Sequence, residues 1–416
     1  MRALCIQRAE LDGELVGLRV EQGAIAELGP GAEPRAGDEV IDAAGMLLVP
    51  PLVNGHTHAA MTLLRGFGDD LPLMEWLEKR IWPAEAKLEP ADVYWATRLA
   101  AVEMIRSGTT RFFDMYWHGD EVARAVADAG LRAVVSHVFI DRLDPEAGRK
   151  MRDGAVQSLD RLAAAGSTIT PGFGPHAIYT VSAETLAWIA GVASEREVPI
   201  QIHLSETERE VSDCLSAHGV RPAQYLDRLG MLGPRTVLSH GVWLDDSELE
   251  LIAERGATIV TNPAANMKLA IGGTFPYPRA ARAGVRVGLG TDGVASNSNL
   301  DMFEEVKLLA LVQKHASRDP AVLPAAEALA VAQGRRSELL GGRPLEPGEP
   351  ADFLLVRRDD PALSAGDPAA DLVYAASGAV VDTTVVAGRV LMRDGFVAAA
   401  EEAVAEVRAR AARLTA

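Results

Sequence analysis

The sequence predicts an α/β protein, a (β/α)8 TIM-type barrel with a small β-sandwich domain formed from both chain ends. Apolar runs of strand length alternate with helical stretches through the middle of the chain, and eight such runs are present. Short β-type runs of similar composition occur at both ends, in segments too short to fold alone. An open doubly wound sheet is the alternative, because periodicity does not distinguish a closed sheet from an open one.

We expect residues 1–48 to form the first part of the small β domain, residues 49–345 the barrel, and residues 346–416 the second part with a C-terminal helix. The strand-like runs at the two ends are residues 3–7, 15–20, 24–28, 352–356, 380–386 and 389–392. Prolines among glycines mark the linker between barrel and second part; they are Pro344, Pro347 and Pro350. The final segment, from about 399 to 414, is rich in Ala, Glu and Arg and predicts a surface helix.

The expected barrel strands follow one another at regular intervals. They are residues 46–53, 109–115, 131–140, 168–173, 199–204, 236–240, 257–261 and 285–289. The helices between them carry their own signals. After Glu89, for example, Pro90 fits a first helical turn, apolar residues recur on one face, and Gly108 ends the helix.

The composition excludes several classes of protein. Of the 416 residues, 48% are hydrophobic and 24% charged, which excludes general disorder. The net charge of −17 repels phosphate backbones and anionic membranes, so we expect no nucleic-acid partner and no membrane partner. Two cysteines, Cys5 and Cys214, make no disulfide framework, and the first twenty residues develop no signal-like apolar run. We therefore expect a cytoplasmic protein; a homo-oligomer stays open.

Polar residues fall where the predicted strands end, which is the face that carries function in barrels of this type. The first strand leads into His56-Thr57-His58, the fifth into His203 with Glu206 three residues later, the sixth ends at His240 and the eighth leads to Asp292. Alternate residues of a strand share a face, so His56 and His58 can direct two imidazoles at one point. Imidazole and carboxylate ligands suit a divalent cation: zinc first, with iron or manganese accepted by the same set.

A lone His-x-His is a weak signal, and joint placement is what strengthens it. Six of the nine histidines lie within a few residues of a predicted strand end; they are His56, His58, His137, His176, His203 and His240. The other three, His118, His218 and His315, are assigned no role.

The segment from Gly288 to Gly293 matches the G-x-G-x-x-G spacing of dinucleotide-binding proteins. It follows the eighth strand rather than the first, and residues 294–299 read as a polar loop rather than as the start of a helix. We therefore expect these glycines to give the backbone room near a crowded site.

These residues resemble the amidohydrolase superfamily, in particular its deaminase branch for S-adenosylhomocysteine and 5'-methylthioadenosine. The resemblance covers nearly the whole chain. Its motifs are residues 51–58 (PLVNGHTH), 61–66 (MTLLRG), 172–176 (GFGPH), 203–206 (HLSE), 239–240 (SH), 262–269 (NPAANMKL) and 290–297 (GTDGVASN).

The resemblance implies one catalytic divalent cation per subunit. Its ligands would be His56, His58, His203 and Asp292. Glu206 would be the acid/base, with His240 and Asp292 as catalytic partners that orient the attacking water. Two-metal members carry a bridging lysine on the fourth strand; residues 172–176 contain none, so a single cation is expected.

The resemblance also implies substrate contacts. Glu85 matches a position that binds ribose hydroxyls, His176 one that contacts the nucleoside, and Arg149 one that meets an amino-acid carboxylate. His137 stands where the branch often carries arginine, and imidazole pairs poorly with a carboxylate. We therefore expect adenosine-type thioethers or deoxyadenosines without a carboxylate to be at least as good substrates as S-adenosylhomocysteine. The apolar side chains of residues 71–82 form either a wall over the 5' substituent or ordinary helix packing.

The expected activity is hydrolytic deamination of an adenine nucleoside to the inosine analogue and ammonia, a hydrolysis at a C–N bond of a cyclic amidine. Candidate substrates are 5'-methylthioadenosine, S-adenosylhomocysteine, adenosine and 5'-deoxyadenosine. One alternative is a deaminase or hydrolase of another N-heterocycle, such as guanine, 8-oxoguanine or an s-triazine. Another is a non-catalytic relative, which would be expected to lack a ligand or the acid/base; this sequence retains all of them.

Overall fold

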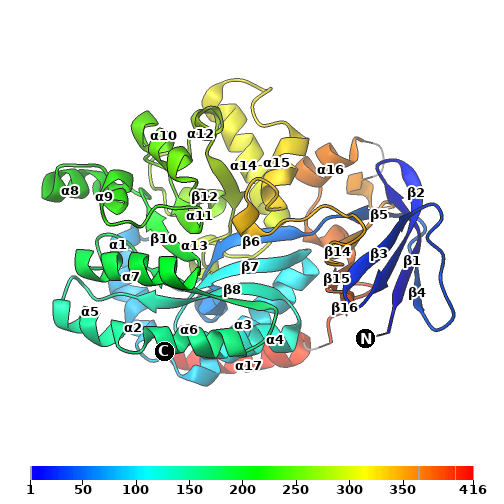
Figure 1. The fold of residues 1–416 in the computed structure, drawn as a ribbon, viewed down its shortest axis with the longest axis horizontal. Helices are drawn as coiled ribbons and strands as arrows, with labels where there is room; N and C mark the ends of the chain where they lie inside the picture. The colour runs from blue at the N-terminus through cyan, green and yellow to red at the C-terminus, as the bar shows by residue number, and fades with distance from the viewer. Residues whose placement is uncertain (1, 364–365, 399, 416) are drawn as a thin grey trace.

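The main body of the protein is a barrel of parallel strands surrounded by helices (Figure 1). The computed structural model describes residues 2–363, 366–398 and 400–415. Within these ranges the eight barrel strands pair in sequence order; they are β6 (Leu52–Thr57), β7 (Thr109–Met115), β8 (Arg132–Phe139), β9 (Ile169–Pro175), β10 (Ile200–Leu204), β11 (Thr236–His240), β12 (Thr258–Thr261) and β13 (Arg286–Leu289). After β13, the Asp292 N–H donates to the carbonyl of His56 in β6 at 3.0 Å. The first and last strands therefore meet, and the predicted barrel is confirmed over the open sheet.

The first expected strand is divided in the structure. Residues Met46–Val49 form β5, which belongs to the small terminal sheet, whereas the barrel strand begins at Leu52. Pro50 and Pro51 lie between them and have no N–H to donate to a ladder, so the chain leaves one sheet there before it enters the other. The continuous run 46–53 was therefore wrong as a single strand.

The helices cover the outside of the barrel and its two ends. They are α1 (Leu73–Trp76), α2 (Trp82–Glu85), α3 (Pro90–Arg106), α4 (Gly119–Ala129), α5 (Pro145–Arg152), α6 (Ala155–Ala164), α7 (Ala183–Arg196), α8 (Glu208–His218), α9 (Pro222–Arg228), α10 (Asp246–Arg255), α11 (Pro263–Lys268), α12 (Tyr277–Ala283), α13 (Val294–Asn297), α14 (Met302–Ser317), α15 (Ala325–Ala332), α16 (Pro368–Tyr374) and α17 (Ala400–Leu414). Short 3-10 turns occupy Ala59–Leu64, Glu338–Leu340, Pro361–Leu363 and Gly378–Val380, and a π-helical turn occupies Leu77–Ile81. No helix in the described ranges is both long enough and apolar enough to cross a bilayer.

Helix α3 shows how the sequence sets these boundaries. Glu89 and Asp92 form a reciprocal capping box at its start, with Pro90 in the first turn. After the helix, Gly108 has φ +78, and a Cβ there would lie 2.6 Å from Leu354 Cδ1. Glycine is therefore required both by the left-handed backbone and by the close approach of β14 (Phe353–Arg357).

The two chain ends form a separate mixed sheet, as the sequence predicts (the dark blue and the orange to red strands in Figure 1). Strand β14 pairs antiparallel with β5, which joins the two halves. The other strands are β1 (Leu4–Leu11), β2 (Glu14–Glu21), β3 (Ala24–Gly29), β4 (Glu39–Asp42), β15 (Val381–Val386) and β16 (Arg389–Met392). This domain encloses a core of its own, which includes Leu4, Ile6, Leu18, Ile25, Ile41, Leu48, Phe353, Leu355 and Val385.

Helix α17, expected from about residue 399, runs beneath the barrel and lies against α3 (Figure 1). Residue 399 itself lies outside the described residues. The fully buried carboxylate of Asp92 in α3 forms ion pairs with Arg410, at 3.1 Å, and with Arg413. The same carboxylate accepts the Glu89 N–H at 2.8 Å. Asp92 therefore ties the end of the chain to the barrel and caps α3.

We expect Asp92→Ala to reduce the free energy of unfolding by about 2 kcal/mol, because two guanidinium groups and one backbone amide lose their acceptor. Chemical denaturation monitored by circular dichroism measures the loss. Glu406→Ala is the matched control: it removes a partly exposed partner of Arg410, and should cost about 0.5 kcal/mol or less. Equal effects of the two substitutions would contradict the account.

The same contact predicts a pH dependence. Burial raises the pKa of Asp92, but hydrogen bonds from Arg413, the Glu89 amide and Arg410 lower it more, so it lies below its ordinary value. A depressed carboxyl pKa contributes stability that is present above the unfolded value of about 3.9 and is lost as the pH falls through the folded value. The difference in stability between wild type and Asp92→Ala should therefore shrink below about pH 4.

Candidate metal centre and active site

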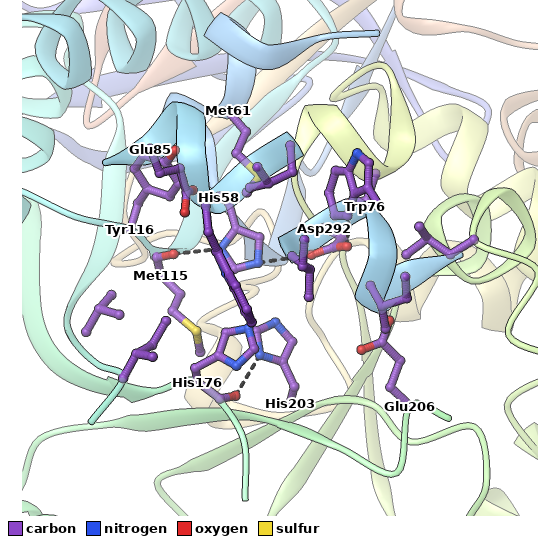
Figure 2. A pocket seen from close by; sticks show the side chains of 18 of the residues that line it. His58, Met61, Trp76, Glu85, Met115, Tyr116, His176, His203, Glu206 and Asp292 are labelled. Carbon is purple, nitrogen blue, oxygen red and sulfur yellow. Dashed lines mark hydrogen bonds and ion pairs between the residues drawn. The ribbon is translucent and has the colours of Figure 1, made fainter. Parts of the chain in front are cut away.

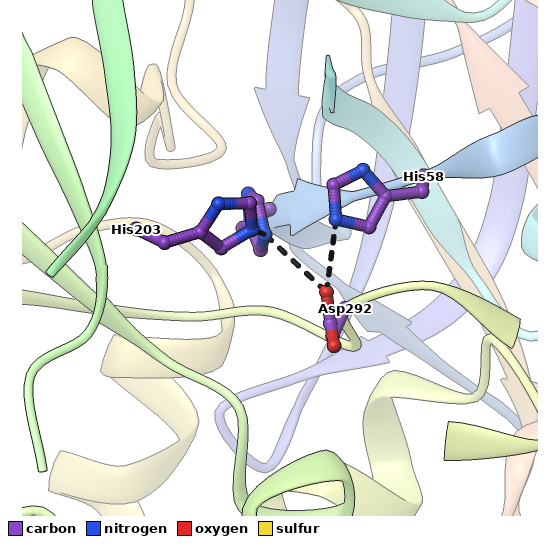
Figure 3. A group of neighbouring side chains, drawn as sticks. His58, His203 and Asp292 are labelled. Carbon is purple, nitrogen blue, oxygen red and sulfur yellow. Dashed lines mark hydrogen bonds and ion pairs between the residues drawn. The ribbon is translucent and has the colours of Figure 1, made fainter. Parts of the chain in front are cut away.

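Three imidazoles and one carboxylate converge at the carboxyl ends of the barrel strands (Figure 3). His56 lies in β6, one residue before its end at Thr57, and His58 lies just beyond; His203 lies in β10, and Asp292 follows β13. One ligand atom from each of the four residues lies within 4.8 Å of all the others. The Asp292 Oδ1 atom is 3.1 Å from His58 Nε2 and 3.4 Å from His56 Nε2.

Each imidazole uses its other ring nitrogen to contact an oxygen. The oxygens are Gln201 Oε1 for His56 at 3.3 Å, the Met115 carbonyl for His58 at 2.6 Å, and the His176 carbonyl for His203 at 2.7 Å. These acceptors favour a proton on Nδ1 and leave the Nε2 lone pairs directed at the common point. His56 Nε2 and His203 Nε2 lie 3.1 Å apart, and two such lone pairs repel unless a cation lies between them. The four residues therefore fit a divalent metal site.

The electrostatics of the cluster favour the forms that bind metal. Burial lowers the pKa of His56 to about 4 and that of His203 well below its ordinary value. Burial raises the pKa of Asp292, but hydrogen bonds from His56 and His58 hold it well below its usual range. His58 differs: burial lowers its pKa, but Asp292 outweighs this and raises it to about 9. Cation binding must displace that proton, so affinity should weaken as the pH falls.

The backbone is constrained at the same strand ends. Ser205, His240 and Asp292 all have left-handed φ values, of 48°, 72° and 59°. Such conformations are costly for residues other than glycine and concentrate at functional sites. Two glycines beside Asp292 give the room that the sequence predicted: a Cβ on Gly290 would lie 2.8 Å from the backbone of His56, and one on Gly293 would lie 2.5 Å from Met61 Sδ. The expected loop after them is wrong at its start, where α13 forms one short helical turn.

Glu206 and His240 lie beside the metal cluster, and both line the same cavity. Glu206 Oε1 is 3.9 Å from His240 Nε2, and His240 Nδ1 contacts Asn266 Oδ1 at 2.8 Å. Burial, with the charge of Asp292, raises the pKa of Glu206 to about 8, whereas burial lowers the pKa of His240. Near neutral pH the pair therefore offers a carboxyl group able to gain or lose a proton beside a neutral imidazole.

Glu210 positions the Glu206 loop, and sequence reasoning missed it. Its buried carboxylate accepts the N–H of Ser205 at 2.8 Å and that of Glu206 at 2.9 Å. Thr207 caps α8 and accepts the Glu210 N–H, so Thr207-x-x-Glu210 reads in the sequence as an ordinary capping box. The carboxylate reaches past the cap to the two preceding amides, which only the folded loop reveals.

The segment Leu73–Glu85 forms one wall of the cavity (Figure 2). The wall residues from this segment are Leu73, Trp76, Leu77, Ile81, Trp82 and Glu85, carried by α1, the π-helical turn and α2. The segment both lines the cavity and packs into the core, since Trp76, Leu77 and Ile81 belong to the main hydrophobic cluster. A role over the 5' substituent stays a prediction. Figure 2 shows Glu85 and Tyr116 on one side of the cavity and Glu206 on the other, with His58 and Asp292 between them.

Glu85 is partly buried, and burial raises its pKa. The buried hydroxyl of Tyr116 lies beside this carboxyl group, and burial with the charge of Glu85 raises the pKa of Tyr116 well above its ordinary value. His176 also lines the cavity, with Nδ1 3.0 Å from Thr180 Oγ1, and burial lowers its pKa to about 3. The cavity is thus lined by a carboxyl group, a phenol and a neutral imidazole beside the metal cluster.

His137 and Arg149 are not brought to this cavity. His137 lies in β8, where successive side chains alternate, and its ring packs on Phe139 at 5.0 Å between ring centres. Val138, on the other face, lines the cavity instead. Arg149 is exposed on α5. Within the described part of the chain, the residues lining the cavity include neither lysine nor arginine. The carboxylate contact expected of Arg149 and the substrate contact expected of His137 therefore have no support in this geometry.

Comparison with known proteins identifies the family. The model of the Amidohydrolase family matches residues 47–391. The chain belongs to the amidohydrolase family. The match begins in β5 and ends in β16, so it includes the whole barrel and every residue of the metal cluster.

Curated relatives of this amidohydrolase are similar over most of their length. A 5'-deoxyadenosine deaminase from Methanoregula boonei is 48% identical over 383 residues, covering 90% of this chain and 86% of its own. A 5-methylthioadenosine/S-adenosylhomocysteine deaminase from Archaeoglobus fulgidus is 42% identical, covering 92% and 91%. The crystal structure of an adenosine deaminase from Xanthomonas campestris with bound zinc superposes with a TM-score of 0.92 at 33% identity, covering 99% of this chain and 98% of the other.

We expect the purified amidohydrolase to carry one divalent cation per chain, measured by elemental analysis. His56→Ala and His203→Ala should lose most of it, because each removes a ligand that has no nearby replacement. Glu206→Gln is the control and should keep its cation, since Glu206 lies outside the cluster. Full cation content in both histidine variants would contradict the assignment.

Proposed function

We propose that this amidohydrolase is a metal-dependent deaminase that converts adenine nucleosides to their inosine analogues and ammonia. One observation carries the proposal: three of the four candidate metal ligands (His58, His203 and Asp292), the acid/base Glu206 and the carboxyl group of Glu85 line one cavity. The metal ligands together with Glu206 suit attack of a water molecule on a ring carbon. Glu85 lines the same cavity and can accept hydrogen bonds from ribose hydroxyls. The relatives named as deaminases of adenosine-type nucleosides support it.

We assign zinc as the cation, with His56, His58, His203 and Asp292 as its ligands. Three neutral imidazoles and one carboxylate are a common zinc set, although iron and manganese accept it too. The zinc in the similar adenosine deaminase supports the choice. When bound, such a cation lowers the pKa of a water molecule to about 7 and so supplies a nucleophile near neutral pH.

Glu206 then moves the proton that the reaction requires. Hydrolysis at C6 of adenine needs a water molecule to lose a proton and ring atom N1 to gain one. Glu206, a buried carboxyl group beside the cluster whose pKa is raised by burial, can accept the proton from water and donate one to N1. His240 and Asp292 orient the water, and the Asn266 contact at His240 Nδ1 leaves Nε2 free to face it. The second proton of the water passes from the oxygen added at C6 to the amino group, a transfer that His240 and Asp292 would assist. The C6–N bond then breaks, ammonia leaves, and the oxygen stays on C6 as the carbonyl of the inosine analogue.

The cavity favours an apolar 5' substituent. Its wall includes Leu73, Trp76 and Leu77, and no lysine or arginine among the described residues lines it, so a carboxylate or phosphate on the substituent would have no basic side chain to pair with. We therefore expect 5'-deoxyadenosine and 5'-methylthioadenosine to be better substrates than S-adenosylhomocysteine. From His137 the sequence predicted that substrates without a carboxylate would be at least as good as S-adenosylhomocysteine; the apolar lining of the cavity is what supports a preference for them.

A second enzymatic function, hydrolysis of another heterocycle, is less well supported. A triazine hydrolase shares the fold, with a TM-score of 0.90, but only 22% identity. Free bases and triazines have no ribose to engage Glu85. We also propose that the enzyme acts on small molecules in the cytoplasm. Its net charge of −17 repels phosphate backbones, so we expect no nucleic-acid partner.

Ammonia release from adenosine, 5'-deoxyadenosine, 5'-methylthioadenosine and S-adenosylhomocysteine tests the proposal, together with the absorbance change from adenine to hypoxanthine. Glu206→Gln should lower kcat by about 10²- to 10⁴-fold, because it removes the proton carrier. The exposed Glu208→Gln is the control and should behave as wild type. Turnover of guanine or a triazine, with no turnover of any nucleoside, would overturn the proposal.

Glu85→Ala separates the two enzymatic functions. If Glu85 holds the ribose, the variant should lose about tenfold or more in kcat/KM for ribosides, the value of one charge-assisted hydrogen bond. Glu78→Ala, an exposed change in the same segment, should have no effect. Unchanged kcat/KM for ribosides in Glu85→Ala would remove Glu85 from the binding site.

A further inference from the structure

A second polar cavity lies at the opposite end of the barrel from the metal cluster. Its lining includes Val53, Arg111 and Arg132 at the starts of β6, β7 and β8, whereas the metal cluster lies beyond the ends of these strands. Gly341, Arg343 and Asp352 close it from the segment that leads back to the small domain. The cavity has a volume of about 250 Å³.

Arg111 is the unusual residue of this cavity. Its Nε atom is buried and has no hydrogen-bond partner among the described residues. The guanidinium carbon lies 5.8 Å from the centre of the Phe113 ring, on the same face of β7. A Cβ on Gly341 would lie 3.1 Å from the same carbon, so the glycine lets the loop pass close over the guanidinium. Burial and the charge of Arg132 both lower the pKa of Arg111.

The other charges of the lining do not compensate Arg111. Asp352 is engaged by Arg132, which donates to both of its oxygens at 2.7 and 3.2 Å. Arg343 has Glu349 at 3.9 Å and keeps 58% of its side chain exposed. The remaining acid of the lining, Glu338, is exposed. Three guanidinium groups therefore face two carboxylates, one already engaged, in a chain whose net charge is −17.

We propose that this cavity binds a small oxyanion, a phosphate or carboxylate group, with the partly buried Arg111 as its inner ligand and Arg343 at the mouth. A guanidinium group presents a planar fork of donors that matches both groups. A partly buried charge with a buried, unpaired Nε is unfavourable, and an anion reduces that penalty. The volume corresponds to roughly eight water molecules, enough for inorganic phosphate or a short dicarboxylate with some water. Nothing in the deamination chemistry requires this site.

Thermal unfolding of the metal-loaded protein tests the proposal. Inorganic phosphate and succinate are titrated separately, with sodium chloride keeping the ionic strength constant. We expect a saturable rise in Tm, because a ligand that binds the folded state stabilises it. Saturation at a lower concentration of phosphate points to a phosphate-bearing ligand, and the reverse order points to a carboxylate.

Variants locate the binding. Arg111→Met should weaken the apparent affinity by about tenfold or more, the value of one lost charge-assisted contact. Arg343→Met changes an exposed side chain, so it keeps the fold and should weaken affinity by about threefold. Arg228→Met, an exposed change at the end of α9, is the control and should bind as wild type. If Arg111→Met does not fold, the affinity of Arg343→Met tests the location of the site, and an affinity equal to that of wild type would contradict it.

The proposal is overturned if neither anion raises Tm saturably. It is also overturned if the rise is the same in wild type, Arg111→Met and Arg343→Met, which would place the anion elsewhere, for instance at the metal centre.

Discussion

The candidate active site depends on closure of the barrel, because its metal ligands come from the first, fifth and last strands. Hydrogen bonds hold the first and last strands together at that point: Asn54 Nδ2 donates to Thr291 Oγ1 at 2.7 Å across 237 positions of sequence, and the Asp292 N–H donates to the His56 carbonyl at 3.0 Å. Closure thus sets the distance between the carboxylate and the imidazoles. It also buries all of them, which keeps His56 and His203 neutral.

Around this cluster, polar groups outside the ligand set fix the groups that would do the chemistry. Glu210 holds the two amides before α8, so Glu206 is presented from a constrained turn. Asn266 fixes His240, and Ser296 donates to Asp292 Oδ2 at 2.5 Å. A bound cation would therefore meet ligands and an acid/base whose directions are already set, which lowers the cost of reorganisation during reaction.

The barrel and most of the metal cluster could be predicted from the sequence, because they follow from the spacing of apolar runs and from the position of polar residues at strand ends. Alternating apolar runs predicted the barrel, and polar residues at strand ends predicted the cluster. Pro50 and Pro51 are a visible signal that divides the first run, because proline cannot donate to a ladder. The sequence does not show that the two halves join different sheets. The substrate contacts of His137 and Arg149 were implied by the family resemblance alone. In the structure the two-residue period of β8 turns His137 away from the cavity, and Arg149 is exposed on α5. Glu210 and Arg111 gain meaning only from neighbours distant in sequence or from the folded loop.

A crystal structure of the metal-loaded protein, with anomalous scattering recorded at the absorption edge of the metal, tests the central claim most directly. The account predicts one anomalous peak, about 2.0 to 2.2 Å from Nε2 of His56, His58 and His203 and from a carboxylate oxygen of Asp292. A peak coordinated by other residues, two peaks in the cavity, or fully active crystals without a peak would contradict it.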